Sequence, residues 1–386
     1  MKMSLENMLE RLKNTDNVVI VGAGKRGKAL HRHLKCRSVT VAYFFDNNQE
    51  LCGNDIDDVK IVKPYKIENG TSMYVIAVDG ERKQEEMLKQ LCSLEIAEED
   101  ITVFDSSAEY DYLSKLDERF YPIELQEMFV ERFGRTIDWN NPVTYNEKVN
   151  CDKINCRENI RTQLADKYLV RDWVKEKIGE QYLNQMYGVW DDADDINFDE
   201  LPNSFALKVN NGSGRNIIVK DKSKIDQDIV RRRLNEWKNN NYAFHFFELQ
   251  YKDIVPKITC EAYLEGMAEN LYDYNIYCFH GEPEYIWCIK ESHKPGCQAS
   301  FYNKDWEMMP FSYGYPKDNV LAPRPVNLDK MLELSRVLSK DFKHVRVDWY
   351  NLPDGRVLFG EMTFTTWGGM FHFEPKEWDT YFGSLI

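Results

Sequence analysis

The sequence predicts an α/β protein in which a small domain with a parallel sheet precedes a larger α+β domain. Its 386 residues are enough for two or three domains. In the first third, short apolar runs alternate with helical stretches, the pattern of parallel strands joined by crossover helices. Further on, apolar runs follow one another through a glycine-rich loop or a Pro-Asp-Gly turn, which indicates hairpins. We expect domains of residues 1–115 and 116–386.

The first domain is expected to hold four strands. Their sequences are NVVIVGAG from Asn17, VTVAYFFDNN from Val39, MYVIAVDG from Met73 and ITVFDS from Ile101. One helix is expected to end near Leu34, and the polar stretch ERKQEEMLKQL predicts another before the fourth strand. Because strands and helices alternate, the sheet is expected to be parallel.

A glycine-rich turn lies between the first strand and the first helix. Gly22, Gly24 and Gly27 match G-x-G-x-x-G in the required context, and Asp46 follows near the usual position for binding a ribose. The domain resembles the Rossmann-like nucleotide-sugar-binding domains of bacterial sugar-modifying enzymes. Three interpretations stay open: binding of a nucleotide or UDP-sugar, a structural or docking role, and a working NAD site.

Composition and charge disfavour several classes of function. The net charge of −14 argues against nucleic acid and anionic membrane surfaces as partners. The nine cysteines form no CxxC pair, so we expect thiols in a reducing compartment. No apolar stretch suits a signal peptide or a membrane span. The protein is therefore expected to be cytoplasmic.

The segment FALKVNNGSGRNIIVK, from Phe205 to Lys220, predicts a strand, a glycine-containing loop and a second strand. Glycines let backbone N–H groups approach phosphates closely, and Lys208 would add a positive charge. The segment does not match the G-x-x-x-x-G-K-[ST] phosphate-binding pattern. It therefore predicts a phosphate-binding loop of another kind.

Two carboxylates stand out in VRVDWYNLPDGRVLFGEMTFTTWGG, from Val345 to Gly369. Side chains alternate across a strand, so Arg346 and Asp348 share one face. A hairpin through the Pro-Asp-Gly turn would bring Asp348 opposite Glu361. Facing carboxylates in an apolar setting repel unless a cation lies between them, and oxygen ligands suit Mg²⁺. The alternative is a solvent-facing hairpin with ordinary surface acids.

Taken together, these segments resemble the ATP-grasp superfamily, and most closely its TupA-like branch, which is linked to bacterial surface-polysaccharide biosynthesis. The phrases that carry the resemblance are NPVTYNEKVN, ADKYLVRDWVKEKIGEQYL, GVWDDADDINFDELP, FALKVNNGSGRNIIVKDKS, YLEG, DYNIYCFHGEPEYI, VRVDWY and FGEMTF. They extend from about Phe120 to Ile386. The second phrase, Ala165–Leu183, also has the pattern of an amphipathic helix.

The resemblance implies a role for each matching position. ATP phosphates would be bound by Lys167 and Lys208, the mobile lid would be Asn211, Gly212, Ser213 and Gly214, the adenine hinge would be lined by Glu261, Tyr263 and Leu264, the ribose would be bound by Glu265, and Mg²⁺ would be bound by Asp348 and Glu361. The usual third metal ligand is Asn; here Thr363 stands in its place. Asn275 stands where the branch often has Lys.

The resemblance further implies a carboxylate–amine ligase that forms an amide through an acyl phosphate. Lys208, Arg346 and Glu361 are the expected catalytic residues, with Arg346 either anchoring the substrate carboxylate or forming an ion pair with the acids. Gly368 and Gly369 would donate backbone hydrogen bonds or mark a tight turn. The implied partners are a sugar acid, such as a nucleotide-linked or polymeric uronic acid, and an amine, in capsule or cell-surface polysaccharide synthesis. A glycosyltransferase and a non-catalytic ATP-binding scaffold are the alternatives.

Overall fold

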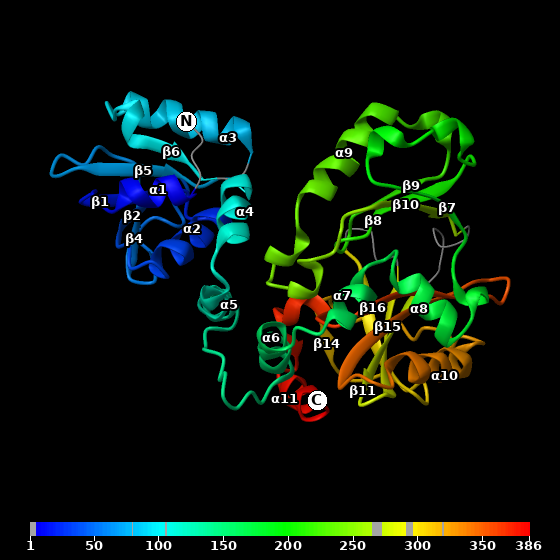
Figure 1. Ribbon diagram of the computed structural model, residues 1–386. Helices are drawn as coiled ribbons and strands as arrows, with labels where there is room; N and C mark the ends of the chain where they lie inside the picture. The colour runs from blue at the N-terminus through cyan, green and yellow to red at the C-terminus, as the bar shows by residue number, and fades with distance from the viewer. Residues whose placement is uncertain (1–4, 79, 105, 265–271, 291–295, 319) are drawn as a thin grey trace. The chain divides into compact units, whose positions relative to one another are not determined.

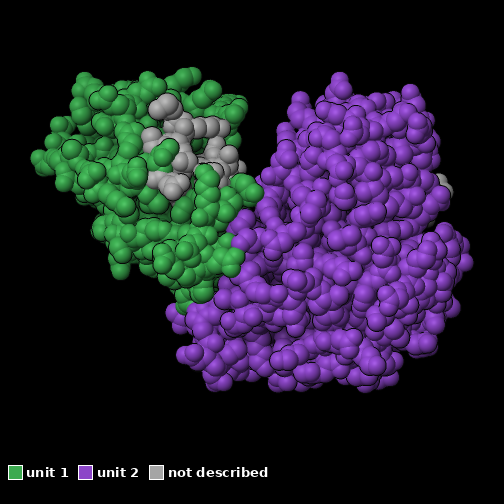
Figure 2. Space-filling model, viewed as in Figure 1, with its two compact units in different colours: residues 1–131 green, residues 132–386 purple. Residues whose placement is uncertain are grey.

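The computed structural model describes residues 5–78, 80–104, 106–264, 272–290, 296–318 and 320–386. The chain forms two compact units, Met1–Glu131 and Arg132–Ile386, coloured separately in Figure 2. Within the described ranges, no helix is both long and apolar enough to cross a membrane.

Unit 1 contains a six-stranded sheet with the order β3-β4-β2-β1-β5-β6. Its strands are β1 (Asn17–Val21), β2 (Val41–Phe45), β3 (Asp55–Ile56), β4 (Val59–Val62), β5 (Ser72–Ile76) and β6 (Ile101–Val103). All neighbours pair in parallel except β3 with β4. The parallel sheet and its four predicted strands are confirmed, whereas the short β3–β4 hairpin was not predicted. Figure 1 shows this sheet at the blue and cyan end of the chain.

Among the described residues, five helices belong wholly or mainly to unit 1. They are α1 (Leu5–Leu12), α2 (Lys25–Lys35), α3 (Glu81–Ser93), α4 (Ser106–Lys115) and α5 (Tyr121–Phe133). The two helices expected from the sequence correspond to α2 and α3. The division between the two units falls within α5, some residues after the predicted boundary at residue 115.

Unit 2 is built around two antiparallel sheets. The first has the order β7-β10-β8-β9 and the second β13-β12-β11-β15-β16. Their strands are β7 (Met186–Trp190), β8 (Phe205–Val209), β9 (Asn216–Val219), β10 (Ile258–Ala262), β11 (Tyr272–Phe279), β12 (Glu282–Lys290), β13 (Gln298–Asn303), β15 (His344–Asn351) and β16 (Val357–Thr363). A small sheet pairs β14 (Ser312–Tyr313) with β17 (Phe373–Glu374). A mostly parallel sheet followed by antiparallel sheets is the predicted fold class, which is confirmed.

The helices of unit 2 are mostly short (Figure 1). They are α6 (Tyr145–Asn155), α7 (Asn159–Ala165), α8 (Val170–Lys177), α9 (Gln227–Asn239), α10 (Leu328–Ser339) and α11 (Glu377–Ser384). The single helix predicted over Ala165–Leu183 is wrong. Asp166 leaves the helical conformation, and its Oδ1 accepts hydrogen bonds from the N–H groups of Tyr168 (2.7 Å) and Leu169 (3.1 Å). A short polar side chain that binds the backbone in this way ends one helix and begins the next.

The two faces of the five-stranded sheet have different environments. Val345, Val347 and Trp349 point into an apolar core that also contains residues of α8 and α10. The opposite face carries Arg346 and Asp348, as the alternation of side chains predicts. This face positions the acids of the candidate site.

Candidate active site

The hairpin β15–β16 brings the two predicted acids together. Arg346 pairs with Thr363 and Val347 with Met362, after which the register shifts by one residue. This bulge places Asp348 beside Gly360 and Glu361. A side chain at position 360 would approach the backbone oxygen of Asp348 to 3.0 Å, so glycine suits this close crossing.

Arg346 lies between the two acids. Its Nε and Nη2 donate to Asp348 Oδ1 (2.7 Å) and Oδ2 (2.5 Å), and Nη2 also lies 3.2 Å from Glu361 Oε1. In this structure, the guanidinium of Arg346 is the cation that lies between the two facing carboxylates. This is the ion pair that the sequence left open as the alternative to a substrate anchor for Arg346.

Thr363 completes this cluster as a hydroxyl bridge. Its Oγ1 accepts a hydrogen bond from Arg346 Nη2 at 3.0 Å and donates to Glu361 Oε1 at 3.2 Å. Thr363 thus orients Glu361. Across the described part of the chain, no group of three or more His, Cys, Asp or Glu side chains could hold a metal. Asp348 and Glu361 are the two carboxylates of this cluster, and both contact Arg346 Nη2. Their oxygen atoms are of the kind that binds Mg²⁺.

The two acids titrate in opposite directions. Burial raises the pKa of Asp348 to about 7, and the charge of Arg346 offsets only part of this effect. Burial alone would also raise the pKa of Glu361, but Lys167 and Arg346 lower it to about 2. Glu361 is therefore ionised at neutral pH and is the better anchor for a cation.

Asn275 lies directly opposite Asp348 on β11. When its amide nitrogen is turned toward the carboxylate, it donates to the two oxygens of Asp348 at 3.2 and 3.3 Å. A neutral donor therefore replaces the lysine that the resemblance led us to consider at this position. Asn275 stabilises Asp348 without competing for it as a second charge.

Lys167 connects the acids to the glycine loop. Its Nζ lies 3.3 Å from Glu361 Oε2 and donates to the backbone oxygen of Gly212 at 2.6 Å. Lys208, on β8, instead pairs with Glu261 of β10 at 2.7 Å. Glu261 is buried and also has Arg171 at 3.6 Å. Lys167 lies in the turn between α7 and α8, whereas Lys208 lies on β8, and each is already beside a carboxylate.

The predicted lid is the loop between β8 and β9. Asn211 and Gly212 are buried, whereas Ser213 and Gly214 are exposed. A side chain at position 212 would meet Tyr242 at 2.8 Å, while Gly214 has a φ of +70° and open space around it. Arg215 anchors the loop by donating to the backbone oxygen of Trp237 at 2.9 Å. The loop thus has a packed base and a free tip.

The remaining nucleotide residues follow β10. Tyr263 and Leu264 are half-buried and directly succeed this strand, while Glu265 lies outside the described residues. Sequence reasoning missed Asn210, whose buried amide donates to Asp166 Oδ2 at 2.9 Å. This bond ties the start of the glycine loop to the residue that precedes Lys167. A polar residue at the end of a buried strand was the only signal for it.

The glycine turn of unit 1 is closed by its own acid. Asp46 Oδ2 accepts from the N–H of Ala23 at 2.8 Å, and Oδ1 accepts from the N–H of Asn48 at 2.8 Å. Gly22 has a φ of +112°, and a side chain at Gly27 would lie 1.8 Å from the Gly22 oxygen. These features serve helix–strand packing. A side chain at Gly24, by contrast, would meet nothing within 4 Å.

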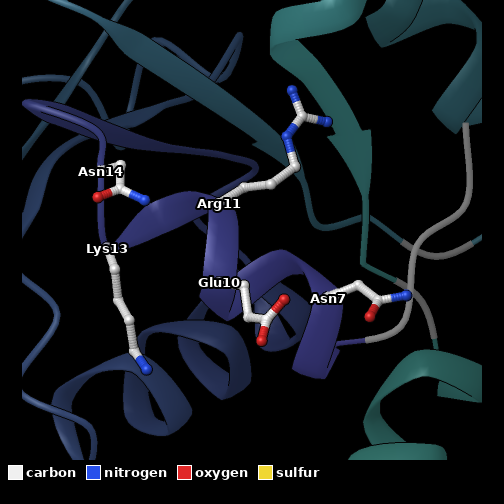
Figure 3. A pocket seen from close by; sticks show the side chains of 5 residues that line it. All are labelled: Asn7, Glu10, Arg11, Lys13 and Asn14. Atoms are coloured by element: carbon white, nitrogen blue, oxygen red, sulfur yellow. The ribbon is translucent and has the colours of Figure 1, made fainter.

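An open hollow beside α1 is lined by exposed polar side chains. They belong to Asn7, Glu10, Arg11, Lys13 and Asn14. Figure 3 shows Arg11 and Lys13 pointing in opposite directions from the helix. Polar groups that do not converge make a poor binding site. The hollow is therefore not a candidate for catalysis.

Comparisons with known proteins place unit 2 in a family. The model of the family described as TupA-like ATPgrasp matches residues 147–386, more than half of the chain. No curated protein sequence matches. Similar solved structures include N5-carboxyaminoimidazole synthase from Aspergillus clavatus (13% identity, 91% of this chain and 70% of that chain, TM-score 0.31), L-amino acid ligase from Bacillus licheniformis (13%, 91% and 68%, 0.34) and D-alanine–D-alanine ligase from Bacillus anthracis (11%, 90% and 84%, 0.31). The chain belongs to the TupA-like ATP-grasp family.

Proposed function

We propose that this protein is an ATP-dependent carboxylate–amine ligase that forms an amide on a sugar acid during surface-polysaccharide synthesis. The observation that supports it best is the position of Lys167, which contacts both the metal-type acid Glu361 and the glycine loop at Gly212. A phosphate between the loop and the acids would replace these contacts. Family membership supports the reaction class, and the chemistry of the substrates is our proposal.

In the proposed complex, Lys167 and Lys208 bind the ATP phosphates, and the loop Asn211–Gly214 covers them. Tyr263 and Leu264 line the adenine, followed by Glu265 at the ribose. Asp348 and Glu361 would hold Mg²⁺, which would neutralise charge on the phosphates during transfer. Because the glycine loop has a free tip at Gly214, it can close over the phosphates and exclude water.

Arg346 has two partners in turn. In the described structure it neutralises Asp348 and Glu361. Once those acids have another counter-charge, the same guanidinium can bind the substrate carboxylate with its fork of donors. The ion pair and the substrate anchor, which were alternatives in the sequence analysis, are then two successive states of Arg346. Gly368 and Gly369 follow this hairpin. The Gly368 N–H already donates to the backbone oxygen of Thr365 at 2.8 Å, so the donor to the acyl phosphate would come from Gly369.

The proposed reaction has two steps. A carboxylate oxygen of the sugar acid attacks the γ-phosphorus of ATP, the bond to the β,γ-bridging oxygen breaks, and ADP leaves. The amine nitrogen then attacks the carbonyl carbon of the acyl phosphate, phosphate leaves with the C–O electron pair, and the amine proton passes to solvent. The protein contributes positioning and charge neutralisation. Unit 1 would bind a nucleotide-linked sugar as part of the substrate.

A hydroxylamine trap tests this proposal. The full chain is incubated with ATP, Mg²⁺, hydroxylamine and single uronic acids, and both ADP and hydroxamate are measured. We expect equal amounts of the two products with the correct acid, and neither with the Glu361→Gln variant. Release of UDP from a UDP-sugar without ATP would identify a glycosyltransferase instead. Nucleotide binding without turnover on any acid would support a scaffold.

A further inference from the structure

The turn Thr365–Phe371, directly after β16, has an unusual backbone. Trp367, Gly368 and Gly369 have consecutive φ values of +52°, +59° and +60°. Left-handed conformations are strained for a residue with a Cβ such as Trp367. A side chain at Gly368 would meet Phe246 at 2.8 Å, and one at Gly369 would meet Asn150 at 2.9 Å. The chain is therefore held closely on both sides of this turn.

Side chains bind five backbone oxygens of this turn. The pairs are Thr366 with Tyr313 Oη (3.1 Å), Gly368 with Lys153 Nζ, Gly369 with Asn150 Nδ2 (2.8 Å), Met370 with Arg132 Nε (2.7 Å) and Phe371 with Asn146 Nδ2 (2.9 Å). At its start, Thr365 Oγ1 donates to the buried Glu248 at 2.6 Å. Such dense anchoring fixes the conformation of an irregular segment that apolar packing alone would leave free.

Lys153 is the centre of this anchoring. It shares one face of α6 with Asn146 and Asn150, since the three are spaced by four and three residues. Its buried Nζ also donates to Asn150 Oδ1 (2.9 Å) and to the backbone oxygen of Phe246 (2.8 Å). All three ammonium donors therefore have acceptors. Burying an ammonium group costs free energy. We therefore infer that the Lys153 ammonium is retained because it holds the turn in a defined position.

The turn carries aromatic side chains near the face of the five-stranded sheet that holds Arg346 and Asp348. The ring of Trp367 packs against those of Phe371 (4.6 Å), Tyr315 (5.2 Å) and Trp287 (6.2 Å). Trp367, Tyr315 and Phe371 are half-buried, so part of their surface is open. Trp287 pairs with Asn275, the neighbour of Asp348, and its ring lies 6.0 Å from the Arg346 guanidinium.

We propose that Trp367, Tyr315 and Phe371 form the wall of the acid-substrate subsite, and that Lys153 is its positioning residue. The ligand would be a pyranose with a carboxylate: the carboxylate binds Arg346 and a C–H face of the ring lies on the aromatic wall. Aromatic side chains combine a large apolar surface with defined geometry, which suits such a ligand. This inference rests on the proposed function, because it assigns the acid that the ligase activates.

Calorimetric titration of the full chain with D-glucuronate, in the presence of Mg²⁺ and a non-hydrolysable ATP analogue, tests the subsite. We expect wild-type protein to bind glucuronate at least about tenfold more tightly than D-glucose, since only the former can pair with Arg346. Trp367→Leu should weaken glucuronate about tenfold and leave the affinity for the ATP analogue unchanged, and Trp367→Phe should restore most of it.

Lys153→Met should weaken glucuronate in the same selective way, while Lys148→Met on the same helix should behave as wild type. Asn150→Ala removes the donor to Gly369 together with one acceptor of the Lys153 ammonium, and it is the second positioning variant if Lys153→Met does not fold. Unchanged glucuronate binding in Trp367→Leu would overturn the wall, and unchanged binding in a folded positioning variant would overturn the role of Lys153. ADP release with a non-sugar acid, without glucuronate binding, would overturn the subsite yet leave the ligase intact.

Discussion

The two units bury a cationic side chain in opposite ways. In unit 1, His33 of α2 lies between Glu124 of α5 (2.8 Å) and Glu109 of α4 (3.2 Å). In unit 2, Lys153 lies among three neutral oxygens. Burial alone would lower the pKa of His33, but its hydrogen bonds to the two glutamates raise it. Burial lowers the pKa of Lys153 to about 7, although Glu248 opposes this. Burial therefore acts to lower the pKa of both groups, and only the two carboxylates beside His33 reverse this direction.

The buried charges of the two units have different partners. Those of unit 1 pair with one another between helices, whereas Arg346 of unit 2 pairs with the acids of the candidate site. The unit 1 cluster joins three helices, and its glutamates also meet Arg26, Arg32 and Arg37. In unit 2, Arg346 holds both acids of the candidate metal site. The buried charges of unit 1 therefore connect its helices to one another. Under the proposed function, the charges of unit 2 lie where phosphate, metal and carboxylate would bind.

The largest expected effect comes from the acid pair. Asp348→Asn and Glu361→Gln should each lower ADP release more than about 100-fold, since each removes a charge aimed at the reacting phosphates. Their effects on the ligand-free protein should differ. Asp348→Asn leaves Arg346 without its two-bond partner and should destabilise unit 2 by about 2–3 kcal/mol. Glu361 is more exposed, so its replacement should cost below about 1 kcal/mol.

Urea titration followed by tryptophan fluorescence measures this difference, because all nine tryptophans lie in unit 2, from Trp139 onward. Asp354→Asn, in the exposed hairpin turn, is the control and should match wild type in turnover. Equal activity of all three variants with wild type would place both acids in a surface hairpin, which is the alternative that the sequence left open.

The second effect concerns Lys208. Lys208→Ala should reduce turnover by about 100-fold, the scale for loss of one preorganised charge contact. It also leaves Glu261 with Arg171 at 3.6 Å as its charged partner, so some stability should be lost as well. Lys220→Ala, at the exposed end of the same hairpin, is the matched control. Normal kcat and KM for ATP in folded Lys208→Ala would reduce Lys208 to a structural partner of Glu261.

Local patterns explain which parts of this site could be predicted. Alternation along a strand and the Pro-Asp-Gly turn are short-range signals, so Asp348 and Glu361 could be placed opposite each other from the sequence alone. The break at Asp166 was also a local signal, an acid that binds the following N–H groups, but helical periodicity concealed it. Tertiary contacts had no such signal. Lys153 binds a backbone oxygen of Gly368, 215 positions away, and backbone oxygens leave no trace in a residue pattern.

The third effect is a pair of opposite pH dependences. Burial lowers the pKa of Lys153 to about 7 in the folded chain from its ordinary value of 10.5, so the unfolded chain binds more protons between these values. The stability of unit 2 should therefore rise with pH across that window, by on the order of 2–4 kcal/mol from this residue. His33 has a raised pKa, so its contribution is complete below about pH 6.5 and is lost as pH rises through the folded value.

Tryptophan fluorescence reads unit 2, and hydrogen exchange in α2 reads unit 1 within the same full chain. Subtracting the pH profiles of Lys153→Met and His33→Gln from that of the wild type removes the other titrating groups. The two difference profiles should have opposite slopes. Slopes of the same sign would break the contrast between the two clusters, because they would mean that burial and not the partner decides the protonation state.

The smallest expected effect comes from two glycines with open surroundings. A side chain would meet nothing within 4 Å at Gly24 in unit 1 or at Gly214 in unit 2. Gly24 has an ordinary φ of −81°, so Gly24→Val should leave stability within about 0.5 kcal/mol, whereas Gly214→Val must adopt a φ of +70° at about 1–2 kcal/mol. In Gly214→Val, impaired lid closure should raise ATP hydrolysis relative to hydroxamate, because water then reaches the acyl phosphate.

In Gly24→Val, the expected effect is on ligand binding at the Gly22–Gly27 turn and not on stability. Titration of the full chain with UDP-sugars and NAD should show binding that this variant loses; equal binding by both proteins, or none by the wild type, would make the Gly22–Gly27 turn purely a packing feature held by Asp46.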